Sequence, residues 1–294
     1  YQLDSGEGEF SDVQYWLRSR DARGGAERAA QLEPGKIELS EARYTTCPEN
    51  NESWWLSGSD IRLDQESGRG DARNVTLRFK DVPVFYTPYI QFPIDDRRMS
   101  GILMPTAAIT NRHGVELAVP WYWNIAPNFD ATLTPRLMED RGVMLETEWR
   151  YLRPTYDGTL DLRYLPDDRE FGDDRYLIAW RQKARPIANL RTDIDINDVS
   201  DTEYFRDFGG DVFSASTAFA TRRATASYDW TNWRLRGQVE DFKSLDPNLP
   251  DRSEPYQRMP QLVLTGGQSP YPGLDLDLTS ELVRFDRKDL ITAT

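Results

Sequence analysis

Strict alternation of apolar and polar side chains is the feature that most limits the fold of this sequence. Residues 129–137 read F-D-A-T-L-T-P-R-L, so every second residue is apolar and the others are Asp, Thr, Thr and Arg. Residues 143–152 repeat the pattern, with Met, Glu, Glu and Arg opposite a largely apolar face. A period of two over about ten residues predicts a β-strand with one apolar and one charged face. A tilted strand of about ten residues is long enough to cross a bilayer, although a soluble β-sandwich gives the same alternation.

The same period recurs along most of the chain. Short β-like runs are expected at residues 10–17, 36–44, 54–63 and 74–79. Between the first two, residues 21–32 are rich in alanine and could form a short helix, but Gly24 and Gly25 are expected to break the chain there. After Gly101, about eleven longer runs fit a strand, at residues 115–123, 129–137, 143–152, 159–165, 175–183, 188–197, 212–221, 223–230, 233–242, 261–265 and 273–285. The chain is therefore predicted to be all-β.

The connections expected between these longer strands are of two kinds, tight turns and long loops. Tight turns are expected at residues 140–142 and 231–232, whereas long loops rich in Pro, Asp and Gly are expected at residues 166–174, 200–211 and 243–259. Short turns at one end and long loops at the other are typical of outer-membrane barrels. Sandwiches distribute loop lengths more evenly, so this pattern favours a membrane barrel.

Composition excludes several classes of protein. The 294 residues are 38% hydrophobic and 29% charged, and no run of eighteen apolar residues exists, so helical membrane spans are not expected. A transmembrane barrel escapes this test because half of each strand faces a polar lumen. Lys and Arg number 36 against 49 Asp and Glu, which gives a formal charge of −13 and argues against a nucleic-acid partner.

The sequence offers little for catalysis or metal binding. His113 is the only histidine, and it lies in N-R-H-G, which is typical of a turn. No cluster of Cys and His suggests a metal, so no catalytic site, metal or cofactor is expected. Asp193 and Asp195 alternate with Ile194 and Ile196, which predicts that the two carboxylates face the lumen.

A proline-rich segment precedes the longer strands. Pro83, Pro88 and Pro93 recur every five residues, too often for a helix interior or a central strand. An extended linker is one interpretation. The charged stretch D-D-R-R-M-S-G, residues 95–101, follows and is expected to act as a hinge.

Several motifs resemble those of the LptD family of outer-membrane lipopolysaccharide (LPS) assembly proteins. They are A-R-Y-T-T-C-P (42–48), V-P-V-F-Y-T-P-Y-I-Q-F-P (82–93), D-R-R-M-S-G-I-L-M-P (96–105), V-P-W-Y-W-N-I-A-P-N-F-D-A-T-L-T-P (119–135) and R-G-V-M-L-E-T-E-W-R-Y-L (141–152). The resemblance implies the C-terminal part of a periplasmic β-jellyroll in residues 1–94, with a turn between strands at residues 21–32. It also implies a hinge in residues 95–104 and the N-terminal part of a large, incomplete antiparallel outer-membrane barrel in residues 105–294. The chain starts at Tyr1 and stops in L-I-T-A-T, so we expect an internal fragment.

The family's function would then be transport rather than catalysis. The resemblance implies insertion of LPS into the outer leaflet of a Gram-negative outer membrane, through a jellyroll conduit, a barrel lumen and a lateral gate. The implied partners are LPS itself, a periplasmic bridge protein (LptA-like) at the jellyroll edge and a plug lipoprotein (LptE-like) in the barrel.

Six residues follow as candidate functional positions. Val75, Leu77 and Phe79 alternate with polar residues and are expected to line the lipid path of the jellyroll. Cys47 is the only cysteine, and the resemblance implies a disulfide to a residue outside this chain, although a free thiol is the alternative. Pro105 and Pro120 match the prolines of the family's lateral gate, where each would remove a backbone donor. Alternatively, Pro105 merely begins a strand and Pro120 marks a bulge.

Two other classes of protein fit the same composition. Nine Trp, fourteen Tyr and many acidic residues are compatible with a secreted carbohydrate-binding or carbohydrate-active β-protein. A small porin-like barrel of ten to twelve strands would also show the alternation. A lectin should be soluble without detergent, and a porin should fold alone and conduct ions.

Overall fold

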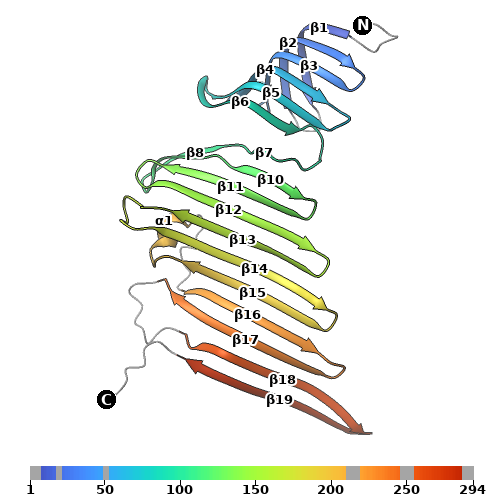
Figure 1. The fold of residues 1–294 in the computed structure, drawn as a ribbon, viewed down its shortest axis with the longest axis vertical. Coiled ribbons are helices and arrows are strands. Elements are labelled where there is room, and N and C mark those ends of the chain that lie inside the picture. The colour runs from blue at the N-terminus through green and yellow to red at the C-terminus, as the bar shows by residue number, and fades with distance from the viewer. Residues whose placement is uncertain (1–7, 18–21, 49–52, 210–218, 246–254, 287–294) are drawn as a thin grey trace. The chain divides into compact units, whose positions relative to one another are not determined.

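The computed structural model describes residues 8–17, 22–48, 53–209, 219–245 and 255–286 (Figure 1). The chain divides into two compact units. The first contains Tyr1–Pro105 and Trp121–Asn124, and the second contains Thr106–Pro120 and Ile125–Thr294. The described residues form antiparallel sheets with one short helix, so the predicted all-β class is confirmed. In this part of the chain, no helix combines the length and apolar character that a membrane span requires.

The first unit contains a six-stranded antiparallel sheet in which each strand pairs with the next along the chain. Its strands are β1 (Gly8–Leu17), β2 (Ala22–Glu33), β3 (Lys36–Thr45), β4 (Trp54–Asp64), β5 (Arg69–Phe79) and β6 (Val82–Pro93). Small side chains dominate its buried face, and Ala26, Ala29, Leu39 and Ala42 form a cluster there. Ala26 and Ala29, like Leu39 and Ala42, are three residues apart, so these strands depart from strict alternation between them, where Asp12 and Glu41 have positive φ.

The expected break at Gly24 and Gly25, and the turn implied for residues 21–32, are wrong. β2 runs continuously from Ala22 to Glu33 and pairs with both β1 and β3. Gly24 lies beneath the ring of Tyr15, whose hydroxyl donates a hydrogen bond to the carbonyl of Arg43 at 2.8 Å. A Cβ at Gly24 would lie 2.4 Å from the Tyr15 hydroxyl oxygen. Glycine is present to admit the aromatic ring rather than to end the strand.

The proline-rich segment is a strand and not a linker. β6 is the last strand of its sheet, and it pairs with β5 from Val82 opposite Phe79 to Pro93 opposite Arg69. An edge strand tolerates proline because one side of its backbone needs no partner. Farther along the first unit, β7 (Gly101–Ile102) pairs with Trp121 and Tyr122, which begin β10 (Trp121–Ala126).

The second unit is built on long antiparallel strands joined in sequence order (Figure 1). They are β11 (Phe129–Met138), β12 (Gly142–Arg153), β13 (Tyr156–Leu165), β14 (Arg175–Ile187), β15 (Leu190–Val199), β16 (Phe219–Asp229), β17 (Trp233–Ser244), β18 (Gln257–Tyr271) and β19 (Leu274–Asp286). A short hairpin of β8 (Thr106–Thr110) and β9 (Gly114–Ala118) joins β11 through β9. Within the described residues, β19 and β8 do not pair with each other, so the sheet is open.

Two expectations for the second unit need correction. Residues 212–221 and 223–230 were expected as separate strands, but β16 runs unbroken through Thr221 and Arg223, and residues 210–218 lie outside the described part. The loop at residues 200–211 was expected to lack regular structure, yet it contains the helix α1 (Tyr204–Phe208). A helix of five residues is too short to show a helical period in the sequence.

Candidate functional site

The long strands of the second unit present two different faces. One face carries large apolar side chains that remain exposed, among them Leu137, Val143, Leu145, Ile178, Leu235, Val239, Leu262, Leu278 and Leu282. Cross-strand register places these residues on the same side, for example Val143 opposite Leu137. We call this side the apolar face and the opposite side the charged face. Exposed apolar side chains on this scale indicate a surface meant for lipid or for another protein.

A row of mostly charged side chains, with acidic and basic residues intermixed, crosses the charged face. Register places its members on successive strands in the order Asp130, Arg150, Thr159, Arg181, Asp195, Arg223, Glu240 and Arg258. Ion pairs join several neighbours, including Arg150 to Asp130 at 2.8 Å and Arg258 to Glu240 at 2.9 Å. Opposite charges on adjacent strands stabilise their pairing. Asp193, like Asp195, lies on this face.

Helix α1 covers one end of the charged face. Its Tyr204 and Phe208 are buried against an apolar cluster from the strands beneath, which includes Met144, Leu165, Leu177 and Val199. The helix belongs to the loop between β15 and β16, at the end of the sheet where the loops are long (Figure 1). The described part of this loop, residues 200–209, therefore folds back over the strands instead of extending away from them.

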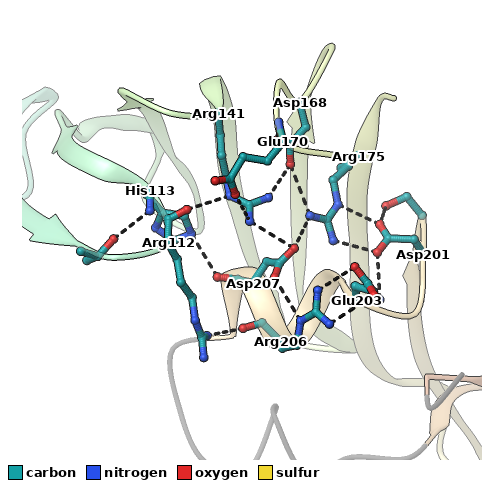
Figure 2. Close-up of polar contacts among 12 residues, drawn as sticks. Arg112, His113, Arg141, Asp168, Glu170, Arg175, Asp201, Glu203, Arg206 and Asp207 are labelled. Atoms are coloured by element: carbon teal, nitrogen blue, oxygen red, sulfur yellow. Dashed lines mark hydrogen bonds and ion pairs between the residues drawn. The ribbon is translucent and has the colours of Figure 1, made fainter. Parts of the chain in front are cut away.

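Arg175 is the centre of the polar contacts that hold this loop (Figure 2). Its side chain is completely buried, at the first position of β14. Its guanidinium lies 2.7 Å from Asp207 of α1, 2.7 Å from Asp201 and 3.3 Å from Asp168. The ring of Phe208 lies 4.9 Å from its carbon Cζ. A buried guanidinium is tolerated only when carboxylates and aromatic faces compensate for lost hydration.

A second arginine shares the same carboxylates. Arg141 Nη1 lies 2.7 Å from Asp168, and Nη2 lies 3.3 Å from Asp207. Its Nε donates a hydrogen bond to the carbonyl of Arg112 at 3.1 Å. We call Arg141, Asp168, Arg175, Asp201 and Asp207 the arginine cluster. The cluster joins strand ends and α1 into one charge-compensated unit.

Two side chains of α1, Asp207 and Tyr204, have shifted pKa values. Burial raises the pKa of Asp207, but the hydrogen bond from Arg175 and the charge of Arg141 outweigh it, so the pKa is lowered. Burial raises the pKa of Tyr204 to about 12. The hydroxyl of Tyr204 has no hydrogen-bond partner among the described residues, so its ring and not its hydroxyl contributes to packing.

His113 connects the β8–β9 turn to α1. The predicted turn is confirmed, but the histidine is buried within it. Its Nδ1 lies 3.0 Å from Glu116, and its Nε2 lies 3.1 Å from the carbonyl of Asp207. Its ring stacks on Phe208 at 5.5 Å with an interplanar angle of 15°. Sequence reasoning missed this role because the partners are 94 positions apart; the aromatic residues of Y-F-R-D-F in an acidic loop were the available signal.

Pro105 and Pro120 each lie between two short strands. Pro105 lies between β7 and β8, and Pro120 lies between β9 and β10. Thr106 pairs with Ala118 on one side of the interruption, and Ile102 pairs with Trp121 on the other. Both prolines therefore stand where the β ladder is discontinuous, immediately before a strand begins.

The three lipid-path candidates differ in burial. Val75 and Leu77 are buried in β5, whereas the side chain of Phe79 at the strand end is half exposed. Leu77 pairs with Leu56 of β4 and with Phe85 of β6, so it lies among apolar neighbours.

Cys47 is half buried, and its thiol is unpaired in this chain. A side-chain hydrogen bond with Thr45 lowers the pKa of the thiol. The backbone carbonyl of Cys47 accepts a hydrogen bond from Arg23 at 3.0 Å, which holds this short segment in place. In the part of the chain that the structure describes, no group of three or more His, Cys, Asp or Glu side chains could hold a metal ion.

These sheets define the class of protein: an incomplete jellyroll followed by antiparallel strands of an open barrel wall. Residues 173–293 match the family model described as LptD: LPS transport system D. The LPS-assembly protein LptD of Nitrosococcus oceani is 39% identical over 97% of this chain and 39% of its own length. Those of Alkalilimnicola ehrlichii and Pseudomonas syringae pv. tomato are each 41% identical, over 89% and 100% of this chain and 34% and 32% of their own lengths. The chain belongs to the LptD family, and it spans roughly a third of the length of these curated relatives.

Proposed function

We propose that this chain carries LPS from the periplasm to the outer leaflet of a Gram-negative outer membrane. Residues 1–94 are assigned to a periplasmic jellyroll part, residues 95–104 to a hinge and residues 105–294 to the first part of a transmembrane barrel. The observation that carries the proposal is the two-faced sheet of the second unit, in a chain related to LPS-assembly proteins along nearly its whole length. We infer transport without covalent chemistry.

The two faces fit the two solvents of a barrel wall. The apolar face, with Val143 and Leu282 among its exposed side chains, suits the hydrocarbon of a membrane. The charged face, with its row from Asp130 to Arg258, suits a hydrated lumen through which a polar saccharide passes. In this orientation the long loops and α1 lie on the cell surface together with the short turns at residues 111–113 and 139–141, and the turns at residues 154–155, 188–189 and 230–232 lie on the periplasmic side.

A lateral gate would lie beside the discontinuous strands. Pro105 and Pro120 cannot donate a backbone hydrogen bond, so the ladder beside them is short of donors. A seam with missing hydrogen bonds at membrane depth is the weakest line of a barrel wall. Opening it sideways would release the acyl chains into the membrane while the saccharide stays in water.

The first unit would supply the lipid path and one docking edge. Val75 and Leu77 face the apolar interior along which acyl chains would slide, with Phe79 at its end. An open sheet edge can accept a strand from an LptA-like bridge protein. The charged lumen would hold an LptE-like plug lipoprotein.

Depletion of the full-length protein tests the function. Surface LPS, measured by labelling intact cells, should fall on depletion and recover when the gene is restored, and the protein should fractionate with outer membranes. Normal surface LPS in depleted cells would overturn the proposal. Extraction into buffer without detergent would support a secreted carbohydrate-binding protein instead.

A further inference from the structure

We propose that residues 201–208, which we call the strap, latch the β8–β9 hairpin to the charged face. The lateral gate would then open only after α1 releases this hairpin. The inference rests on the proposed function, and it identifies residues that would control the gate. Arg112 and His113 act as positioning residues, because they hold the hairpin and touch no transported lipid in this scheme.

Backbone pairing attaches the hairpin to the sheet through β9. β9 pairs with β11 along Glu116–Ala118, and hydrogen bonds from the backbone N–H groups of Glu139 and Asp140 to the carbonyls of Val115 and His113 extend this attachment to the turn. Among the described strands, β8 pairs with β9 and with no other. A further contact at the turn would therefore strengthen the hold on the hairpin.

The strap supplies that contact at the turn of the hairpin (Figure 2). The guanidinium of Arg112 donates a hydrogen bond to the backbone carbonyl of Arg206. His113 Nε2 lies 3.1 Å from the carbonyl of Asp207, and the His113 ring stacks on Phe208. Two adjacent turn residues therefore contact three successive residues of α1.

The other side of the strap is fixed to the middle of the sheet. Asp207 is bound to Arg175 of β14 at 2.7 Å, and Asp201 binds the same guanidinium at 2.7 Å. α1 therefore cannot follow the hairpin outward without breaking buried ion pairs. A hairpin that moves must instead break its own contacts with α1.

Side-chain contacts also connect the hairpin to β11. Arg136 of β11 binds Glu116 at 2.8 Å, and Glu116 lies 3.0 Å from His113 Nδ1. The two ring nitrogens of His113 thus lie beside the carboxylate of Glu116 and the carbonyl of Asp207. Sheet, hairpin and strap are thus joined through one buried imidazole.

A reversible crosslink tests the latch in cells that produce the full-length protein. Arg112→Cys and Arg206→Cys together place one thiol on the hairpin and one on α1, at exposed positions. Treatment of intact cells with a bifunctional thiol reagent that has a reducible spacer should tie hairpin to strap. New surface LPS should fall roughly tenfold, since a covalent tie removes the open state from the equilibrium. Cleaving the spacer should restore export by the same folded molecules.

The matched control is Glu203→Cys with Arg206→Cys. It loses the same Arg206–Glu203 ion pair and takes the same reagent, but both thiols lie on the strap. Crosslinking this variant should leave export unchanged. Unimpaired export by the hairpin–strap variant after complete crosslinking would overturn the latch. Depletion of the protein in the same strain must still abolish export, so failure of the latch is distinguished from failure of the proposed function.

Discussion

Asp207 Oδ2 lies 2.7 Å from Nη1 of Arg175, although 32 positions separate the two residues in the sequence. Arg175 begins a strand and Asp207 belongs to a helix of five residues that could not be stable alone. The ion pair and the aromatic rings around it fix the loop between β15 and β16 on the charged face. The order of that loop therefore depends on a buried charge pair.

Replacing Arg175 with Met should destabilise the loop strongly. The substitution removes the guanidinium that binds Asp201 and leaves Arg141 as the remaining cation beside Asp168 and Asp207, and loss of one partner of a buried pair typically costs about 3–5 kcal/mol. Urea unfolding in lipid vesicles, with proteolysis at residues 201–208, should report the loss. Tyr204→Phe is the control: it removes a buried hydroxyl without a hydrogen-bond partner and should be neutral or stabilising. Equal destabilisation by both variants would contradict the role of the charge pair.

Protonation of Asp207 at low pH should destabilise the contacts that hold the loop on the sheet. The pKa of this carboxyl is lowered in the folded protein from its usual 3.8, so its stabilisation is complete above that value and is lost as the pH falls through the lowered pKa. The free energy of unfolding should decrease below about pH 4 in the wild type, and less so in Asp207→Asn. Identical pH profiles for the two proteins between pH 5 and pH 2 would count against this assignment.

Replacing both Pro105 and Pro120 with Ala should tighten the proposed gate. Each substitution restores a backbone donor, and each new ladder bond would contribute about 0.5–1.5 kcal/mol in water. Export should slow, which can be measured as reduced surface LPS and reduced resistance to large hydrophobic antibiotics. If the double variant folds and exports normally, the prolines only shape the strand ends.

Cys47 should be disulfide-bonded in the full-length protein, to a partner outside this chain. A bond that closes a loop of hundreds of residues could contribute on the order of 4–5 kcal/mol by chain entropy. Non-reducing gels should show a mobility change on reduction, and Cys47→Ser should abolish or alter that change. An unaltered pattern would identify Cys47 as a free thiol.

Leu77 and Arg78 should differ in their contact with transported lipid. Leu77 is buried among apolar neighbours and Arg78 is exposed on the other side of β5, because successive side chains alternate. A photo-crosslinking residue at position 77 should capture LPS in cells, and one at position 78 should not. Equal capture at both positions would show that this interior is an ordinary core.

The sequence by itself determined β11 and β12 and the two faces that they present. The period of two in residues 129–137 and 143–152 is a local property of the chain, and it reappears as β11 and β12 with Val143 on the apolar face and Glu146 on the charged face. The turn around His113 was equally visible, because turn chemistry also acts over a few neighbouring residues.

Only the tertiary structure decided the course of β2 and the position of α1. Glycine is common in turns, but at Gly24 the ring of Tyr15 from β1 fills the space that a side chain would occupy. The strap has no periodic signal, and it is ordered by Arg141 of the β11–β12 turn and Arg175 of β14. Contacts between distant residues leave no local pattern, because each partner satisfies its charge or fills its space only after the chain has folded.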